Sequence, residues 1–328
     1  MRVFVTSKSF ARAAPDALDL LKDKGIDVDF AAKRTMTIPE IAAEIGGYDA
    51  LIVGNDPVDD TVFAAADRLR LVHMHGTGLD AIDVVAATKR GILVANAPGV
   101  NRNAVAELTV ALMLIAARSI DRHIEILKAG RWDRSAGSEV SGKTIGVLGL
   151  GNTGQRVVEL LSGFNVRVVG FDIRPDVAWA ASNGVALAES ADEVFATADF
   201  LILALSLNPE TQRIVDAGRL ALMKPSAILV NTARGGLIDE AALCAALAEK
   251  RIAGAALDAF DPEPLAADSP LRSSGAVLTP HLAATSREAA ANVSRVVANN
   301  VVDVLVHGRV DCAVNAAQIR TPRAAVAR

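Results

Sequence analysis

The chain has 328 residues, of which 51% are hydrophobic and 22% are charged, and its formal net charge is −4. This length suits two domains of ordinary size, and the apolar share is large enough for each to have its own core. The negative balance, without any basic cluster, argues against nucleic acid as a partner. The two cysteines, Cys244 and Cys312, are too few for a disulfide framework or a zinc site, and we expect no metal.

The apolar runs of the chain are short. The longest extends from Leu108 to Ala117, is bounded by charged residues, and is too short to cross a bilayer. The N-terminal segment from Met1 to Lys8 becomes polar too soon for a signal-peptide core. We therefore expect a cytoplasmic protein with no membrane partner.

Short apolar runs alternate with helical patterns through the first hundred residues. Strands are predicted at 3–6, 50–53, 71–74 and 92–95, and helices at 16–24, 58–66 and 80–89. This alternation indicates a mostly parallel sheet. A helical pattern then runs from Asn103 to a glycine stop at Gly130. Because it is too long for a simple crossover, we interpret it as a connector between domains.

The strongest motif follows a loop at 130–141. The apolar run 144–148 leads directly into Gly149-Leu150-Gly151-Asn152-Thr153-Gly154, a G-x-G-x-x-G pattern. At this spacing Gly149 permits a tight turn, Gly151 lets the backbone approach a pyrophosphate, and Gly154 lets the following helix pack closely on the strand. The exposed N–H groups and the positive end of that helix would face the anion.

A second apolar run, at 166–171, is followed by Asp172, eighteen residues after Gly154. A carboxylate at this position can accept hydrogen bonds from the adenosine ribose and repels a 2′-phosphate. The unit of strand, turn, helix, strand and aspartate therefore predicts NAD binding, with NADP disfavoured. Arg174 could soften that preference, because a guanidinium attracts a phosphate.

The alternation resumes after this motif. Strands are predicted at 200–205, 227–231, 254–257 and 276–279, with a helix at 239–250 among the intervening ones. The last helical pattern, at 287–307, leaves too little chain for a third domain. We expect it to pack on the N-terminal domain and to make that domain discontinuous. The tail from Arg320 lacks a core pattern and is expected to be mobile.

Three of these predicted strands lead into polar side chains, at the edge where open α/β sheets bind ligands. Arg234 stands beside glycines, and a guanidinium there can hold a carboxylate with two parallel hydrogen bonds. Glu263 lies in an acidic, proline-containing loop, and His281 follows the last strand. Each residue alone also fits an ordinary surface or structural role. Together they supply what hydride transfer to a 2-keto acid requires: a carboxylate anchor, a proton donor and an acid that orients it.

Other conspicuous residues favour structural roles. His73 and His75 share one face of a predicted strand, but no carboxylate or cysteine completes a metal set near them. We therefore expect both histidines to serve packing and contacts within the N-terminal domain. Trp132 is interpreted as a packing residue, and Cys244 as part of a helix core.

With these segments described, the chain resembles the D-isomer-specific 2-hydroxyacid dehydrogenase family over nearly its whole length. The match also rests on the segments at 76–83, 96–99, 104–108 and 130–132. The resemblance implies an α/β fold of two Rossmann-like, doubly wound parallel-sheet domains, the N-terminal one flavodoxin-like and discontinuous. Residues 1–100 plus 286–328 would form a substrate-binding lid domain, and 101–285 an NAD-binding Rossmann domain. In the family these domains close over a cleft, and a homodimer forms through the long helix near 103–130.

Carried over residue by residue, the resemblance implies that Arg234 binds the substrate carboxylate and polarises the keto group. His281 would be the acid/base, Glu263 its partner, and Asp258 would hold the nicotinamide carboxamide. The implied substrate contacts are His75, Gly76, Thr77, Gly78 and Arg234. The implied cofactor contacts are Thr77, Gly149, Gly151, Asn152, Thr153, Gly154, Asp172, Ser206, Thr232, Ala233, Arg234, Asp258, His281, Ala283 and Ala284.

The implied activity is transfer of hydride between NAD(H) and a small D-2-hydroxy acid/2-keto acid pair, of glyoxylate/hydroxypyruvate type or phosphoglycerate type. Phosphoglycerate-type members commonly carry arginines near Gly54 and Met74, which this chain lacks, and the segment 204–211 is closer to glyoxylate and hydroxypyruvate reductases. Formate dehydrogenases of the family have a glutamine in place of Glu263. Two alternatives stay open: a non-catalytic NAD-sensing interaction protein, and a dehydrogenase of a sulfonated or inorganic acid.

Overall fold

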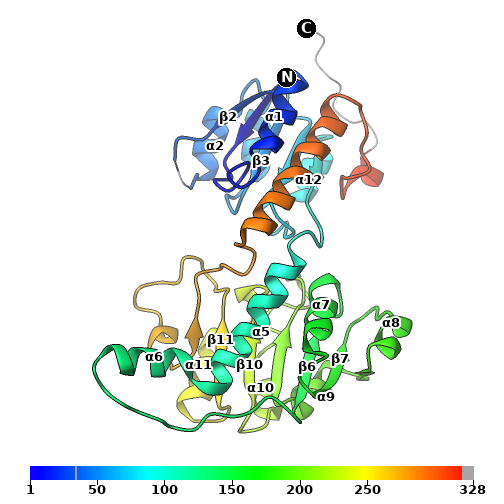
Figure 1. Cartoon of the computed structure of the whole chain (residues 1–328). Coiled ribbons are helices and arrows are strands. Elements are labelled where there is room, and N and C mark those ends of the chain that lie inside the picture. The colour runs from blue at the N-terminus through cyan, green and yellow to red at the C-terminus, as the bar shows by residue number, and fades with distance from the viewer. Residues whose placement is uncertain (34, 320–328) are drawn as a thin grey trace. The chain divides into compact units, whose positions relative to one another are not determined.

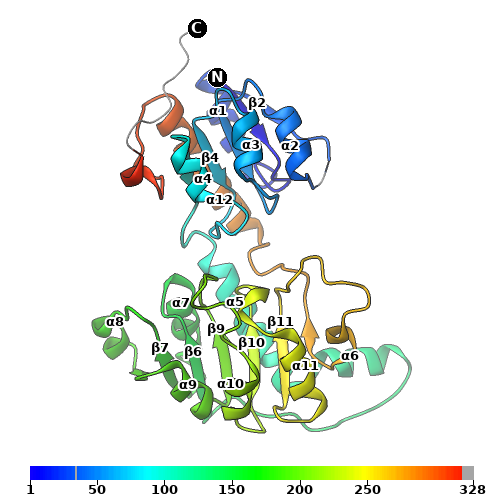
Figure 2. The same cartoon turned by 180° about the vertical axis from the view of Figure 1, so that it is seen from behind.

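The computed structural model describes residues 1–33 and 35–319, so the tail from Arg320 lies outside the described residues. The chain divides into two compact units, one built from residues 1–101 and the chain from Thr285 onward, the other from residues 102–284. In each unit helices cover both faces of a parallel sheet (Figure 1 and Figure 2). The predicted class of two doubly wound α/β domains is confirmed.

The first unit contains a five-stranded parallel sheet in the order β2-β1-β3-β4-β5, which is the flavodoxin-like order. Its strands are β1 (Arg2–Val5), β2 (Asp27–Phe30), β3 (Ala50–Val53), β4 (Leu71–Met74) and β5 (Leu93–Ala95). Its helices are α1 (Pro15–Asp23), α2 (Ile38–Glu44), α3 (Asp60–Ala65), α4 (Val84–Lys89) and α12 (Arg287–Leu305). Helices α1 and α12 cover one face and α2, α3 and α4 the other (Figure 1 and Figure 2). Since α12 comes from the end of the chain, the unit is discontinuous, as expected.

The second unit contains a seven-stranded parallel sheet in the order β12-β11-β10-β9-β6-β7-β8. Its strands are β6 (Thr144–Leu148), β7 (Arg167–Phe171), β8 (Val185–Leu187), β9 (Phe200–Leu203), β10 (Ile228–Asn231), β11 (Gly254–Leu257) and β12 (Val277–Leu278). Helices α5 (Arg102–Arg118), α7 (Asn152–Leu161) and α8 (Val177–Ser182) pack on one face. Helices α9 (Ala191–Thr197), α10 (Ala217–Leu222) and α11 (Glu240–Ala248) pack on the other.

The order of the second sheet places its ligand-binding edge. From β6 the chain builds outward through β7 and β8 on one side, and then from β9 to β12 on the other. The connections therefore reverse direction between β6 and β9. Ligands of open α/β sheets bind outside the carboxyl ends of the strands at such a reversal.

The single helix predicted from 103 to 130 is wrong. α5 ends at Arg118, and α6 (Ile120–Lys128) begins after Ser119, whose φ of 46° is left-handed. The two helices meet at an angle of 65°. A left-handed residue interrupts the α-helical hydrogen bonds, and no glycine or proline in the sequence indicates the break. α5 is also more than a connector, because its buried side chains pack on the second sheet.

Two strands of the structure, β2 and β8, are absent from the strands predicted. Both lie at an edge of their sheet, where a strand is paired on one side only. No residue of β2 is fully buried, and only the first residue of β8 is. Their apolar patterns are therefore too weak to distinguish them from loops.

Trp132, for which a packing role is expected, is 81% exposed and therefore joins no core of its own chain. Cys244, in contrast, packs beside the core under α11, where burial raises the pKa of its thiol. Within the described ranges, no single helix is both long and apolar enough to span a membrane. Only the bent pair of α5 and α6, taken together, reaches that length and composition.

Candidate functional site

The glycine-rich turn joins β6 to α7, and its three glycines have different surroundings. Gly149 has a φ of 91°, and a Cβ on it would lie 2.6 Å from the carbonyl oxygen of Ala204. A Cβ on Gly154 would lie 2.0 Å from the carbonyl oxygen of Gly149, so a larger residue cannot fit there. A Cβ on Gly151 would meet no described atom within 4 Å. The turn therefore packs tightly against its own protein at Gly149 and Gly154, and leaves space for a ligand at Gly151.

The residues around this turn suit an anionic dinucleotide. Helix α7 begins after Gly151 and no side chain caps it, so its first N–H groups are available to an anion. Oδ2 of Asp172 accepts a hydrogen bond from the amide of Leu150 at 2.8 Å, and Oδ1 accepts one from the amide of Arg174 at 2.9 Å. The carboxylate thus ties the end of β7 to the glycine turn. Each oxygen keeps a further lone pair for a ribose hydroxyl.

Beside Asp172, the side chain of Ile173 is 81% exposed. An apolar side chain at the end of β7 offers a surface for a flat base next to the ribose position. Sequence reasoning did not single out Ile173, because the alternating pattern of a strand does not reveal whether its next residue is covered. The only signal was its place directly after Asp172.

The loop after β10 presents Arg234 and is held by a buried asparagine. Asn231 is fully buried, its Nδ2 donates to the carbonyl of Arg234 at 2.9 Å, and its Oδ1 accepts from the amide of Ala233 at 3.0 Å. The Thr232 hydroxyl lies 2.6 Å from that of Thr109 on α5. One guanidinium nitrogen of Arg234, Nη1, donates to the carbonyl of Ala233 at 2.8 Å. Asn231 was not predicted as a site residue, although a polar residue at the end of a buried, apolar strand could have indicated it.

Asp258 directly follows β11 and holds the segment that carries His281. It is fully buried. Its Oδ1 accepts from the Thr279 hydroxyl at 2.6 Å and from the amide of Leu282 at 2.9 Å, and its Oδ2 accepts from the amide of Ala283 at 2.8 Å. Two of these hydrogen bonds fix the backbone directly after His281, and the third holds the side chain of Thr279, two residues before it. They hold His281 at a φ of 50°, a conformation that residues other than glycine seldom adopt.

His281 and Glu263, which the sequence paired, are in direct contact. Nδ1 of His281 lies 2.7 Å from Oε2 of Glu263 and 2.9 Å from Oε1. Oε1 also accepts the amide of Phe260 at 3.0 Å. About a third of each side chain is exposed. With a proton on Nδ1 directed at the carboxylate, Nε2 is the ring atom left for proton transfer.

The charges around Glu263 keep it ionised. Burial alone would raise the pKa of its carboxyl group. The hydrogen bonds from His281 and Phe260, together with the positive charges of His281 and Arg234, outweigh burial and hold that pKa below its usual value. Arg234, Glu263 and His281, which follow three different strands, are therefore brought into one electrostatic environment at the carboxyl edge of the sheet.

The remaining predicted cofactor residues of this unit lie along the same edge. Ser206 is exposed just beyond β9, and its carbonyl accepts a hydrogen bond from the Thr211 hydroxyl at 2.7 Å. Ala283 is buried and Ala284 half-buried, directly after His281. The described residues include no group of three or more His, Cys, Asp and Glu side chains that could hold a metal ion.

In the first unit, the loop after β4 offers a row of backbone donors. The carbonyls of Gly76 and Thr77 accept hydrogen bonds from the amide of Ala97 at 2.8 Å and from Nδ2 of Asn96 at 2.6 Å. The amides of Gly76, Thr77 and Gly78 have no acceptor among the described residues. Free backbone N–H groups of this kind are donors to which an anion can bind. The hydroxyl of Thr77 lies 3.1 Å from Oδ1 of Asn101.

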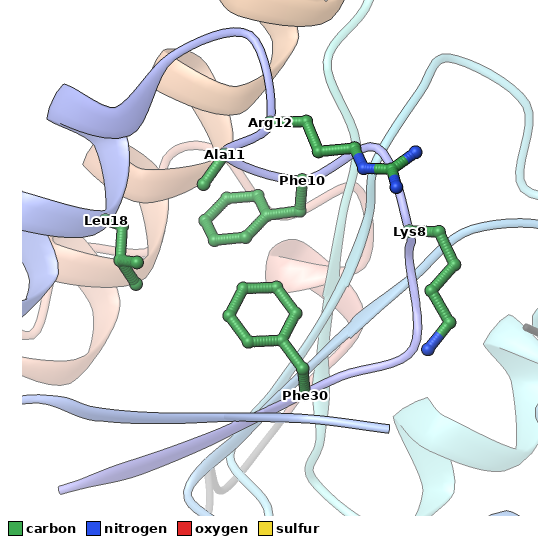
Figure 3. A pocket seen from close by; sticks show the side chains of 6 residues that line it. All are labelled: Lys8, Phe10, Ala11, Arg12, Leu18 and Phe30. Carbon is green, nitrogen blue, oxygen red and sulfur yellow. The ribbon is translucent and has the colours of Figure 1, made fainter. Parts of the chain in front are cut away.

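A pocket of about 310 Å³ opens elsewhere in the first unit. Figure 3 shows the rings of Phe10 and Phe30 facing each other on one side of it, while Lys8 and Arg12 extend on the other. None of its lining residues was predicted for the site. Phe10 nevertheless contacts the site loop, because its ring meets the imidazole of His75 edge-on at 5.8 Å.

Comparisons with known proteins agree with this geometry. The family model described as "D-isomer specific 2-hydroxyacid dehydrogenase, NAD binding domain" matches residues 110–283. D-3-phosphoglycerate dehydrogenase of Methanocaldococcus jannaschii is 42% identical over 88% of this chain and 55% of that protein. Glyoxylate reductase of Pyrococcus furiosus is 36% identical over 92% of this chain and 91% of that protein.

Among solved structures, the TT0316 protein from Thermus thermophilus matches with a TM-score of 0.86 at 34% identity, covering 96% of this chain and all of that one. The chain spans about half the length of the curated phosphoglycerate dehydrogenases that it matches. The chain belongs to the D-isomer-specific 2-hydroxyacid dehydrogenase family, and its second unit contains the family's NAD-binding domain.

Proposed function

We propose that this protein is an NAD-dependent dehydrogenase that interconverts a small D-2-hydroxy acid and its 2-keto acid. The observation that carries the proposal is the contact between His281 and Glu263 at the carboxyl edge of the NAD-binding sheet, with Arg234 in the same electrostatic environment. A general acid, its orienting carboxylate and a carboxylate-binding cation are the groups that this reaction needs.

The cofactor supplies the hydride when it is bound. The open side of Gly151 and the first amides of α7, including those of Asn152 and Thr153, would receive its pyrophosphate, and Asp172 its ribose. Ile173 would lie against its adenine. Ser206, Thr232, Ala233, Ala283, Ala284 and, from the first unit, Thr77 are proposed as further contacts. Asp258 differs from these, because both of its carboxylate oxygens already accept hydrogen bonds from the protein. It is proposed to contact the nicotinamide carboxamide of the cofactor only through a lone pair that these bonds leave free.

In the reduction, protonated His281 donates from Nε2 to the keto oxygen. The Glu263 carboxylate stabilises the imidazolium before this transfer and keeps Nδ1 protonated after it. Arg234 anchors the carboxylate of the substrate and polarises its keto group. The three free amides of Gly76, Thr77 and Gly78 are proposed as further donors to that carboxylate.

The substrate is proposed to be of the glyoxylate or hydroxypyruvate type. Gly54 and Met74 stand near the positions where phosphoglycerate-type members of the family commonly carry arginines, and Met74 is only 5% exposed. A relative named for glyoxylate reduction, from Pyrococcus furiosus, is matched over 91% of its own length. A phosphate bound without charge-assisted hydrogen bonds would lose about 1.5–3 kcal/mol for each one missing.

We also propose a homodimer formed through α6 and the loop that follows it. Ile120, Ile124 and Leu127 are 40%, 46% and 60% exposed and recur at the spacing of one helix face, and the exposed Trp132 lies just beyond. Exposed apolar side chains at such spacing are typical of an interface. The cytoplasmic location expected from the sequence stays a prediction.

The test follows NADH absorbance with the purified protein against glyoxylate, hydroxypyruvate, pyruvate, phosphohydroxypyruvate and sulfopyruvate. We expect turnover, with glyoxylate or hydroxypyruvate fastest. Faster turnover of phosphohydroxypyruvate or sulfopyruvate would overturn the substrate class but keep the chemistry. Turnover of none, with NADH binding shown separately by fluorescence titration, would favour an NAD-sensing role.

A further inference from the structure

We propose that His75 is a positioning residue, whose imidazole, held between Ser9 and Ser294, fixes the amides of the loop Gly76–Gly78. The proposal deepens the proposed function and rests on it, because it concerns the loop assigned there to the substrate carboxylate. Every residue involved lies in the first unit.

The imidazole of His75 connects three separate segments. Its Nδ1 lies 3.0 Å from Oγ of Ser9, in the loop after β1, and its Nε2 lies 3.0 Å from Oγ of Ser294 on α12. The ring of Phe10 packs edge-on against it, at an interplanar angle of 88°. Phe10 is only 2% exposed and also forms one wall of the pocket in Figure 3. The side chain that opens the loop is therefore fixed on two sides.

The hydrogen bonds also determine which ring nitrogen carries the proton. The Ser294 hydroxyl donates its only hydrogen to the carbonyl of Ala290 at 2.8 Å. Its oxygen must therefore accept from both the amide of Ala11, at 3.1 Å, and Nε2 of His75. With the proton on Nε2, Nδ1 accepts from the hydroxyl of Ser9.

The ring is neutral in this arrangement, and burial favours the same state by lowering the pKa of His75 to about 4. Both nitrogens then have partners suited to an uncharged imidazole. His75 thus acts through its position and not through a positive charge offered to the substrate.

The loop needs such support because two of its three residues are glycines, which have the greatest backbone freedom. On its C-terminal side the loop is tied down by Asn96 and Ala97, through the carbonyls of Thr77 and Gly76. On its N-terminal side the amide of His75 donates to the carbonyl of Val53 at 2.7 Å, and the imidazole of His75 adds a side-chain anchor directly beside Gly76. Fixing both ends directs the free amides before an anion arrives, which lowers the entropy lost on binding.

His73, two residues earlier on β4, provides a matched comparison. It is fully buried, its Nδ1 lies 2.8 Å from the carbonyl of Met74, and its Nε2 lies 3.0 Å from Nδ2 of Asn300, also on α12. Ser294 and Asn300 therefore each link α12 to one histidine. The link through Ser294 reaches His75, which directly precedes the loop, whereas the link through Asn300 reaches His73 and, through it, the carbonyl of Met74 at the end of β4.

The test compares Ser294→Ala with Asn300→Ala in the full-length protein. In Ser294→Ala we expect the KM for the keto acid to rise about five- to tenfold, the factor that loss of a hydrogen bond produces, with kcat and the Kd for NADH within about twofold of the parent. Asn300→Ala should lower the Tm by about as much as Ser294→Ala does, but its KM for the keto acid should stay within about twofold of the parent. His75→Gln, whose amide can still donate to Ser294, should retain a lower KM than His75→Ala. Equal KM values in parent, Ser294→Ala and His75→Ala would overturn the proposal.

Hydrogen exchange separates failure of this proposal from failure of the proposed function. The amide of Ala97 is bonded to the carbonyl of Gly76, so its protection reports the order of the loop without any substrate. We expect this amide to exchange faster in Ser294→Ala and not in Asn300→Ala. If the parent reduces no keto acid but the exchange differs in this way, the proposed function fails and the positioning role stands. If the parent is active and exchange is the same in both variants, the positioning role fails.

Discussion

Nδ1 of His281 lies 2.7 Å from Oε2 of Glu263, although the two residues come from loops after different strands. His281 stands in a left-handed conformation, with hydrogen bonds to Asp258 fixing the backbone that follows it. Glu263 is held in turn by the amide of Phe260. The pair is therefore aligned by the protein before any substrate binds, which is what a general acid requires.

Replacing His281 by alanine should remove the proton donor and leave the glycine turn intact. A positioned acid/base contributes on the order of 10²- to 10⁴-fold in rate, so we expect kcat to fall by at least about a hundredfold. NADH binding, measured by fluorescence titration, should stay within a few-fold of the parent. Near-normal turnover in His281→Ala would exclude His281 as the acid.

Glu263→Gln should change the pH dependence of the reduction. In the reduction His281 is the proposed proton donor, so a charge that favours its protonated form favours the reaction. The pKa of Glu263 is itself held below its usual value, so in the parent the carboxylate stays ionised throughout the neutral range and favours the imidazolium. An uncharged amide cannot do so, and the variant should lose rate faster than the parent as the pH rises.

The measurement for Glu263 is kcat/KM against pH, from about pH 5.5 to 9, in parent and variant. The ratio of parent to Glu263→Gln should grow as the pH rises, because only the parent has a charge beside His281 that favours its protonated form. A ratio that is the same at every pH would mean that Glu263 only shapes the loop and does not act on the charge of His281.

Arg234→Ala should damage substrate affinity and rate together, because the same cation is proposed to anchor the carboxylate and polarise the keto group. Each charge-assisted hydrogen bond lost costs about 1.5–3 kcal/mol, which is roughly a ten- to hundredfold fall in kcat/KM. Arg234→Lys keeps the positive charge but cannot form two parallel hydrogen bonds to a carboxylate. Its kcat/KM should therefore lie between that of the parent and that of Arg234→Ala. If kcat/KM were unchanged in Arg234→Ala, another cation would have to hold the carboxylate.

The parts of the fold that could be predicted are those whose buried residues form a continuous apolar run in the sequence. β3 and β10 are buried along their whole length and coincide with continuous apolar runs. The edge strands β2 and β8 were missed because one-sided pairing needs little burial. The bend at Ser119 was missed because neither the composition nor the helical periodicity of the sequence indicates that this serine adopts a left-handed conformation.

The candidate site divides in the same way. Arg234, Glu263 and His281 were identified because each lies in a segment that follows an apolar run, beside glycine or proline, and because the family resemblance assigns a role to each. The groups that hold them in place were not identified. Asn231 and Asp258 act through hydrogen bonds to backbone groups, those of Asp258 reaching a segment more than twenty residues away, and no spacing rule indicates which amide a buried side chain will meet.

Gly151→Ala and Gly154→Ala should separate cofactor binding from stability. A methyl group on Gly151 points into open space at a φ of −76°, so the Tm should change little while the Kd for NADH rises about tenfold or more. A methyl group on Gly154 would lie 2.0 Å from a carbonyl oxygen, so overpacking of about 1–3 kcal/mol should lower the Tm by several degrees. Equal NADH affinity in Gly151→Ala and the parent would place the pyrophosphate elsewhere.

The exposed apolar face of α6 predicts the oligomeric state. Burying Leu127 and Trp132, which are 60% and 81% exposed, in a contact with a second copy would remove them from water, so the parent should have the mass of two chains by light scattering after size exclusion. Leu127→Glu should shift it toward the mass of one chain, because a buried unpaired carboxylate is costly. Val85→Glu is the matched control, since Val85 is 65% exposed on α4 of the other unit and its substitution should leave the dimer intact. A parent with the mass of one chain, or equal effects of both substitutions, would contradict an interface at α6.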